Sequence, residues 1–415
     1  MRSLDMMAVV LLFAFAVATG AAQAERLTFV VNAGALDQEA WETIAATYTE
    51  RTGTEVELLI IPWEQYHEKL STMIASGTPP DILFYSARFI VSLAADGAFE
   101  DHTHYAEVMQ GAHEVFPAGF DEVTINGQLY GIPSDLNVSL IALNADMFAA
   151  GGLVSPVQQW KAGTWTWNAF LEAARRLTRD LNGDGVPDQA GTANFSTWAG
   201  NWPVWFWTNG ARILSEDRRS VAANSLAGIE ALTFVSELSL VHRVTGGRWQ
   251  DGTTGMWVAG LNTLQSYRQQ IGYNWDIVPF PVGPSGSGTS ATYFGGGYSI
   301  LKDAPNKEAA YRFLDFLVSE EVEEIRTRLA ARLPIKRNGV QRFLDSEHRP
   351  DLKPANLDLI MDIIAAARPL PIVPVWNEME AVWWEEVRPV LNGAQPANYG
   401  LNRFAERVNP ILASW

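Results

Sequence analysis

The chain has 415 residues, with 30 Lys and Arg against 47 Asp and Glu, and a formal net charge of −17 at pH 7. A uniformly acidic chain without a basic stripe repels phosphate backbones, which argues against nucleic acid as a partner. The absence of cysteine excludes disulfides, thiolate metal sites and catalytic thiols. The 16 tryptophans exceed the roughly 1% of residues that average composition gives, so some should line a binding surface.

Residues 1–24 have the pattern of a signal peptide. The apolar run at 8–18 is too short to span a bilayer, and small residues at 22 and 24 follow it. We expect cleavage near Ala24, which removes one base and one acid and leaves the net charge unchanged. An uncleaved anchor helix is the alternative. Because no cysteine follows the signal, we expect a free protein without a lipid anchor in a Gram-negative periplasm. We also expect it to be a monomer.

Alternating strands and helices open the mature chain. Apolar strands are expected at 27–31, 55–61 and 81–84, separated by helices with apolar residues at helical spacing. This alternation predicts an α/β fold with a parallel sheet and helices on its faces. Ligands of such sheets bind beyond the carboxyl ends of the strands.

The pattern changes after the proline at 133, which we interpret as a first passage between two lobes. A strand at 139–143, helices at 167–178 and 226–240, and a glycine triplet at 295–297 predict a second region and a return crossing. About 390 mature residues exceed the usual single-domain size of roughly 50 to 250. The expected organisation is lobe 1 at 25–134 and 293–336, and lobe 2 at 135–292 and 337–415.

Several segments, in this order, resemble the extracellular solute-binding proteins of the carbohydrate class, which includes maltose-binding protein. They include GTPPDILFY at 77–85, NGQLYGIP at 126–133, WDIVPFPVGP at 275–284 and FGGGYSILKDAPNKEAAYRFLDFL at 294–317. The resemblance implies a two-lobed type II periplasmic binding protein fold with two or three hinge crossings. It also implies a receptor that closes on a sugar between its lobes and delivers it to the membrane subunits of an ABC importer.

Sugars offer hydroxyl groups and flat C–H faces, so a site for them combines charged or amide groups with aromatic rings. Candidates of these types follow the predicted strands and flank the crossings, together with glycines that permit close approach. For Asp81 a turn cap is the alternative, for each tryptophan core packing, and Tyr298 could point to the ligand or the core. The predicted ligand-binding residues are Asn32, Glu64, Asp81, Arg88, Asp135, Asn137, Trp202, Trp205, Trp207, Trp257, Gly296, Gly297, Tyr298 and Trp376.

One segment matches most of a calcium-binding loop. Its candidate ligands, in loop order, are Asp180, Asn182, Asp184, Val186 and Asp188. The last position of the loop is occupied by glycine instead of a bidentate Glu, and a metal-free turn made by Asx side chains explains the same residues. No cofactor is therefore required, and structural calcium is the open alternative.

A polysaccharide hydrolase or lyase is the competing function, because Glu64, Asp81 and Asp135 could supply paired carboxylates. The sequence has no nucleophile elbow, phosphate loop or dinucleotide glycine signature, which favours a receptor over an enzyme. Among receptors, the alternative ligands are a polyol phosphate, a polyamine or a peptide. A phosphate would require several bases, whereas only Arg88 and Arg332 fall at suitable positions.

Overall fold

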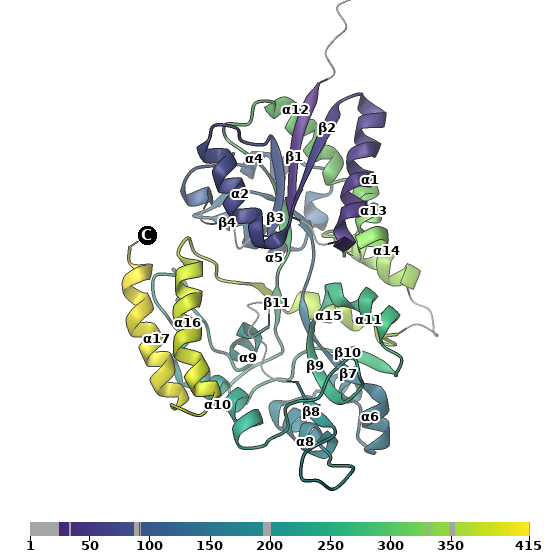
Figure 1. Cartoon of the computed structure of the whole chain (residues 1–415), viewed down its shortest axis with the longest axis vertical. Coiled ribbons are helices and arrows are strands. Elements are labelled where there is room, and N and C mark those ends of the chain that lie inside the picture. Colours follow the sequence, from purple (N-terminus) through teal and green to yellow (C-terminus); the bar gives the residue numbers. More distant parts are fainter. Residues whose placement is uncertain are drawn as a thin grey trace, which may run out of the picture.

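The computed structural model describes residues 25–32, 35–86, 91, 93–193, 201–330, 332–347 and 353–414. They form two lobes stacked along the long axis of the molecule, each built around its own sheet (Figure 1). The two-lobed α/β fold is therefore confirmed. Within the described residues, no helix is both long and apolar enough to cross a membrane.

Lobe 1 contains a five-stranded sheet in the order β2-β1-β3-β12-β6. The buried apolar run of β1 pairs in parallel with both β2 and β3, as the sequence predicts. β12 returns from lobe 2 and pairs antiparallel with β3 and β6, so the sheet is mixed rather than parallel. The strands are β1 (Arg26–Asn32), β2 (Glu55–Ile61), β3 (Ile82–Ser86), β6 (Ile132–Asp135) and β12 (Gly296–Ile300), with a hairpin of β4 (Thr124–Ile125) and β5 (Gln128–Leu129).

Helices from two distant parts of the chain cover this sheet. α1 packs against α13 and β2, and α12 packs against β12 (Figure 1). Segments before residue 76 and after residue 295 therefore share one core. The helices of lobe 1 are α1 (Ala35–Thr52), α2 (Trp63–Ala75), α4 (Thr103–Val108), η1 (Ala112–Glu114), α5 (Pro117–Val123), α12 (Lys307–Leu317), α13 (Glu320–Ala330) and α14 (Arg337–Glu347).

Lobe 2 contains a four-stranded sheet in the order β10-β7-β9-β8 and a separate group of helices in which α10 packs on α9, α16 and α17 (Figure 1). Its strands are β7 (Ser139–Asn144), β8 (Ala190–Thr192), β9 (Thr254–Gly260) and β10 (Trp275–Val278), with β11 (Ala291–Tyr293) paired to β13 (Ala367–Pro369). Its helices are α6 (Ala145–Ala150), α7 (Pro156–Lys161), α8 (Trp167–Leu177), α9 (Pro203–Thr208), α10 (Leu226–Leu240), η2 (Leu261–Thr263), α11 (Leu264–Gln270), α15 (Leu359–Ala365), α16 (Trp376–Leu391) and α17 (Ala397–Leu412).

The chain passes between the lobes at three places. The first two are 136–138, between β6 and β7, and 294–295, between β11 and β12. The third follows α14, because Arg342 of α14 pairs with Glu320 of α13 in lobe 1, whereas Lys353 donates to the carbonyl of Tyr273 in lobe 2. The boundary predicted at 336 is therefore too early, and lobe 1 extends through α14.

Candidate ligand-binding site between the lobes

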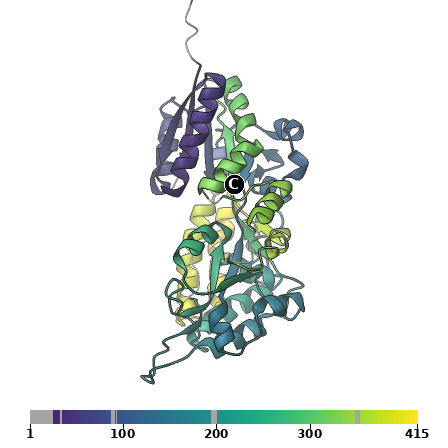
Figure 2. The same cartoon turned by 90° about the vertical axis from the view of Figure 1, so that its right-hand side faces the viewer.

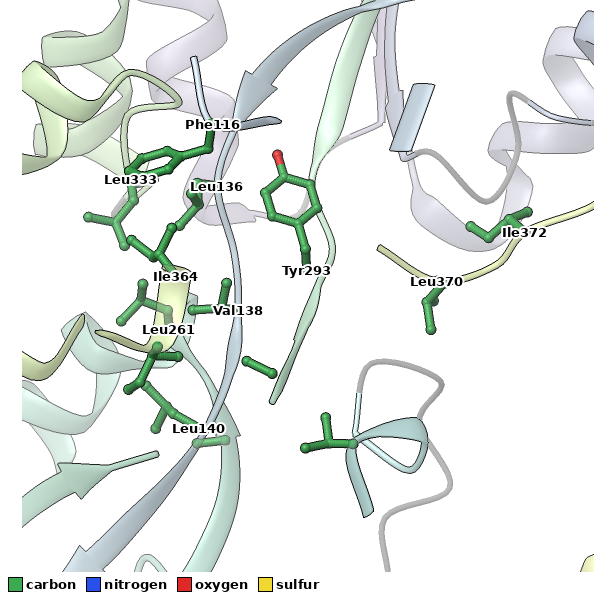
Figure 3. Packing of buried hydrophobic residues seen from close by; sticks show 14 of the residues in the cluster. Phe116, Leu136, Val138, Leu140, Leu261, Tyr293, Leu333, Ile364, Leu370 and Ile372 are labelled. Carbon is green, nitrogen blue, oxygen red and sulfur yellow. The ribbon is translucent and has the colours of Figure 1, made fainter. Parts of the chain in front are cut away.

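The first two crossings run side by side and are packed by apolar side chains from both lobes. Val138 forms an isolated β-bridge with Tyr293, and Leu136 forms one with Leu333. All four side chains are buried, and Figure 3 shows them with neighbours from the two lobes above and below. A change in the angle between the lobes must therefore be absorbed in part by a few backbone dihedral angles at these two crossings.

Asp135, the last residue of β6, is buried at the first crossing and fully engaged within lobe 1. Its Oδ1 accepts hydrogen bonds from the Ser134 hydroxyl at 2.7 Å and the Gly296 N–H at 3.2 Å. Its Oδ2 lies 3.5 Å from Nη2 of Arg326 and 3.7 Å from Nη1 of Arg332. Burial alone would raise the pKa of Asp135, but the two guanidiniums and two hydrogen bonds lower it below its ordinary value. Asp135 therefore positions two arginines, whereas the sequence predicted a direct ligand contact.

Arg332 is the most exposed member of this network. Its Nε and Nη2 donate to Oδ1 and Oδ2 of Asp37, both at 2.8 Å, which makes a bidentate pair. Asp37 lies in the first turn of α1, just after the carboxyl end of β1. The Arg332 side chain is 27% exposed and that of Asp37 is 11% exposed, against 3% for Arg326. At the sheet edge where ligands of α/β proteins bind, the structure thus presents a partly open ion pair.

Arg326 lies over an aromatic cluster that supports the network from the core. Its guanidinium carbon is 4.6 Å from the ring centre of Trp41 and 4.9 Å from that of Phe84. The Tyr298 hydroxyl accepts a hydrogen bond from Nη1 of Arg326, and burial raises the pKa of Tyr298 to about 12. Tyr298 therefore points into the core of lobe 1, which decides between the two orientations that the sequence allows.

Glu122 of α5 contacts the second crossing. Both of its carboxylate oxygens accept the Gly295 N–H, at 3.2 and 3.0 Å. Burial raises the pKa of Glu122 to about 8. The negative charge of Asp135 also raises this pKa, whereas the hydrogen bond from Gly295 lowers it. A buried carboxyl group with a raised pKa is therefore bonded to the backbone of a crossing.

Asp81 has a structural role in lobe 1. It is buried, its Oδ2 accepts the N–H of Thr28 at 2.8 Å, and its Oδ1 accepts the N–H of Asn306 at 2.7 Å. These bonds tie β1 to the start of α12. Asp81 is therefore structural, although it joins distant segments instead of capping the local turn before Ile82, and its oxygens are not presented to a ligand.

Gly296 and Gly297 lie inside β12 rather than in a crossing. A Cβ atom on Gly296 would stand 2.6 Å from the ring of Phe84, and one on Gly297 would stand 3.2 Å from the carbonyl oxygen of Ile132. Neighbouring strands and side chains occupy the space next to these glycines, where the sequence predicted close approach of a ligand. Glycine is needed at 296 for close packing within lobe 1.

The remaining polar candidates have different surroundings. Asn137 is buried, and its Oδ1 accepts the N–H of Asn262 at 3.1 Å, which fastens the first crossing to lobe 2. Asn32 ends β1, and its buried Oδ1 accepts no hydrogen bond from the described residues. Glu64 is exposed in the first turn of α2, and Arg88 lies outside the described residues. Asn32 and Glu64 therefore stay candidate ligand contacts, whereas the side-chain oxygen of Asn137 is engaged with lobe 2.

Four of the five predicted tryptophans are packed in the interior of lobe 2. Trp202 stacks on Trp383 with ring centres 4.0 Å apart and an interplanar angle of 19°. Trp205 meets other rings of the lobe 2 core edge-on. Trp207 and Trp376 are buried as well. Core packing therefore describes Trp202, Trp207 and Trp376, contrary to the prediction that they contact ligand, whereas Trp205 also lines a pocket together with Asn201 and stays a candidate ligand contact.

Trp257, the fifth predicted tryptophan, lies in β9 and is partly exposed. It pairs in register with Ala142 of β7 and packs against the hydrophobic core without being enclosed by it. Of the five, it is the side chain that best fits stacking on a ligand.

The 180–188 loop joins α8 to β8 at the end of lobe 2 that is farthest from lobe 1 (Figure 2). The carboxylate oxygens of Asp180 accept the N–H groups of Gly183 and Gly185, and Oδ2 of Asp188 accepts two further N–H groups of the loop. Asn182 and Asp184 make similar bonds. Across the described residues, no group of three or more His, Asp or Glu side chains is arranged to hold a metal ion. The carboxylates thus accept hydrogen bonds from the backbone of the loop.

Asp37, Glu122 and Arg326 were not among the residues predicted from the sequence. The sequence did contain a sign of two of them. Glu122 and Arg326 occupy positions on the buried faces of their helices, next to Val123 and Ile325, where an apolar residue is expected. A charged residue on such a face needs a partner inside the protein. Asp37 had no such signal, since acidic residues are common in the first turn of any helix.

Comparisons with known proteins agree with the fold and its two lobes. Residues 33–324 match the family model of bacterial extracellular solute-binding proteins. A maltooligosaccharide ABC transporter solute-binding lipoprotein of Streptococcus pneumoniae is 22% identical over 382 residues, covering 88% of this chain and 83% of its own. A lactose-binding protein of Rhizobium radiobacter is 23% identical over 350 residues, covering 76% and 75%.

Among solved structures, an ABC substrate-binding protein of Listeria monocytogenes in complex with cycloalternan superposes with a TM-score of 0.79 at 22% identity. The match covers 94% of this chain and 99% of the Listeria chain. At this identity the superposition establishes the shared fold. Together with the family match over residues 33–324, it shows that the chain belongs to the bacterial extracellular solute-binding proteins, which are receptors of ABC importers and not enzymes.

Proposed function

We propose that this receptor binds an uncharged mono- or oligosaccharide between its lobes. The observation that carries the proposal is the ion pair of Arg332 and Asp37, partly open at the carboxyl end of β1 and backed by Asp135. Such a pair offers both donors and acceptors, which is what sugar hydroxyls require. The sugars named for the Streptococcus, Rhizobium and Listeria proteins support the same class of ligand.

Binding between the lobes would drive the receptor from an open to a closed form. A ligand that contacts both lobes only in the closed form shifts the equilibrium toward it by its differential affinity. The packed crossings at 136–138 and 294–295 are suited to act as the hinge. The closed form is then what the membrane subunits of the importer recognise.

The exported protein is proposed to begin near Glu25 and to work as a monomer in the periplasm, without nucleic acid as a partner. The apolar run at 8–18, the small residues that follow it and the net charge of −17 support these assignments. N-terminal sequencing of periplasmic material is the test, and an intact Met1 would overturn the proposed cleavage.

No cofactor is proposed for ligand binding, and the 180–188 loop is proposed to be a turn that is stable without an ion. Its carboxylates already accept backbone N–H groups, which is the metal-free alternative weighed from the sequence. Removing calcium should then leave sugar binding unchanged.

A polyol phosphate, a polyamine or a peptide is the second class of ligand. The charges of Arg332 and Arg326 are matched by those of Asp37 and Asp135, so the network has no net charge to attract an anion or a cation. This balance favours a neutral sugar over a phosphate or a polyamine.

A thermal-shift screen separates these classes. The panel contains glucose, lactose and maltotriose, with glycerol 3-phosphate, spermidine and a tripeptide as alternatives. A ligand that binds only the folded state stabilises it by about 2.7 kcal/mol at a hundred times its Kd. We expect a rise in the unfolding temperature with at least one sugar. A rise only with the phosphate, the polyamine or the peptide would contradict the proposal.

A further inference from the structure

Arg332 is restrained by two carboxylates of lobe 1. Asp37 accepts from Nε and Nη2, and Oδ2 of Asp135 lies 3.7 Å from Nη1. The side chain is nevertheless 27% exposed. Arginine presents five N–H donors in a rigid plane, so two bonds to Asp37 leave donors for a further partner.

The position of this pair relates it to both the sheet edge and the hinge. Asp37 follows β1, beyond whose carboxyl end ligands of such sheets bind. Arg332 directly precedes Leu333, whose carbonyl accepts the N–H of Leu136 in the first crossing. A ligand that touches this pair is therefore placed where closure of the lobes can enclose it.

The network is balanced in charge. Asp37 and Asp135 contribute two negative charges, and Arg326 and Arg332 contribute two positive charges. A carboxylate or phosphate on a ligand would meet Arg332 only in competition with Asp37, at a distance where like charges repel. A hydroxyl group has no such penalty, because it can accept from Arg332 and donate to Asp37 together.

We propose that Arg332, positioned by Asp37, is the residue of lobe 1 that selects uncharged polyhydroxyl ligands over acidic sugars. It binds ligand hydroxyls through its free N–H groups, while Asp37 cancels the charge that would attract a uronate. This inference rests on the proposed sugar-binding function and adds to it the residue pair that sets the charge class of the ligand.

The test compares neutral and acidic probes on four variants by titration calorimetry. The probes are glucose, lactose and maltotriose, with glucuronate as the acidic counterpart of glucose. Arg332→Met should weaken binding of the neutral sugar about ten- to a hundredfold, as loss of charge-assisted bonds does. Asp37→Asn should narrow the preference for glucose over glucuronate at least about tenfold, because it leaves Arg332 with a net charge.

Arg312→Met is the matched control. Arg312 forms a comparable surface pair with Glu25 at 2.5 Å, but at the start of β1, at the opposite end of the strand from Asp37. This variant should bind all probes as the wild type does. Arg332→Lys is the second variant at this position, in case Arg332→Met does not fold. Lysine keeps the positive charge but lacks the planar guanidinium. This variant should lose less affinity than Arg332→Met and should have the unfolding temperature of the wild type.

The outcomes are distinguishable. A wild type that binds no neutral sugar overturns the proposed function, and this inference with it. If the wild type binds sugar, two results overturn only the selection by this pair. One is that folded Arg332 variants bind neutral sugar as tightly as the wild type. The other is that Asp37→Asn keeps the wild-type ratio of affinities for glucose and glucuronate.

Discussion

Replacing Asp135 by alanine should damage folding more than ligand binding. The Asp135 side chain is 5% exposed and that of Arg326 is 3% exposed, so the variant leaves a guanidinium buried without its carboxylate. Removing one partner of a buried ion pair typically costs about 3 to 5 kcal/mol of folding free energy. The sequence alone suggested a loss of affinity from ligand hydroxyls left without a partner, and the structure changes that expectation.

Urea unfolding followed by tryptophan fluorescence measures the loss, and calorimetry on the folded protein measures binding of the sugar identified by the thermal screen. We expect the unfolding free energy to fall by about 3 to 5 kcal/mol, with less than about a tenfold change in affinity. A double variant, Asp135→Leu with Arg326→Met, removes both charges and should recover a large part of the stability.

A different pattern would refute this reasoning. If Asp135→Ala unfolds within about 1 kcal/mol of the wild type and binds sugar ten- to a hundredfold more weakly, Asp135 contacts the ligand directly. The positioning role derived from Arg326 and Arg332 would then be wrong.

Three further predictions concern the core, the hinge and the loop. Trp202→Ala should lower the free energy of unfolding in urea by about 3 to 5 kcal/mol, because Trp202 stacks on Trp383 in the interior. The affinity for sugar should not change, and a weaker affinity with normal stability would contradict this prediction. Since the pKa of Glu122 is raised from 4.5 to about 8, its contribution to stability is full below pH 4.5 and lost as the pH rises through 8. Glu122→Gln should therefore flatten the fall in stability between pH 5 and pH 8, by a few kcal/mol at most, and equal slopes in both proteins would speak against the assignment. Calcium or a chelator should leave the unfolding temperature and the sugar preference unchanged, and a saturable rise with calcium would show that the 180–188 loop binds an ion.

Local sequence pattern predicted most of the elements. β1, β2, β7, α8 and α10 lie where apolar runs and helical spacing placed them, because these patterns report directly which side chains face a core. The antiparallel insertion of β12 was not predictable in the same way. It depends on a pairing between residues about 160 to 210 positions apart, such as Gly296 with Asp135 and with Ser86, and no local pattern encodes that partner choice.

The site was less accessible from sequence than the fold. A tryptophan has the same identity in a binding surface and in a core, and only the contact of Trp202 with Trp383, far along the chain, decides between them. Asp135 was found as a residue of the crossing, but its role depends on Arg326 and Arg332, which come from α13 and the segment after it. Long-range ion pairs of this kind become visible only when the fold brings the segments together.

The most direct test of the proposed function is to follow a single sugar through binding and release. Calorimetry with the neutral oligosaccharide selected by the thermal screen should give one ligand per chain, and mass spectrometry after denaturation should recover that sugar unchanged. A receptor that closes on an uncharged sugar requires both results. Recovery of shortened sugar would indicate an enzyme, and absence of binding to every neutral sugar would contradict the assignment of the Arg332 and Asp37 pair to a sugar site.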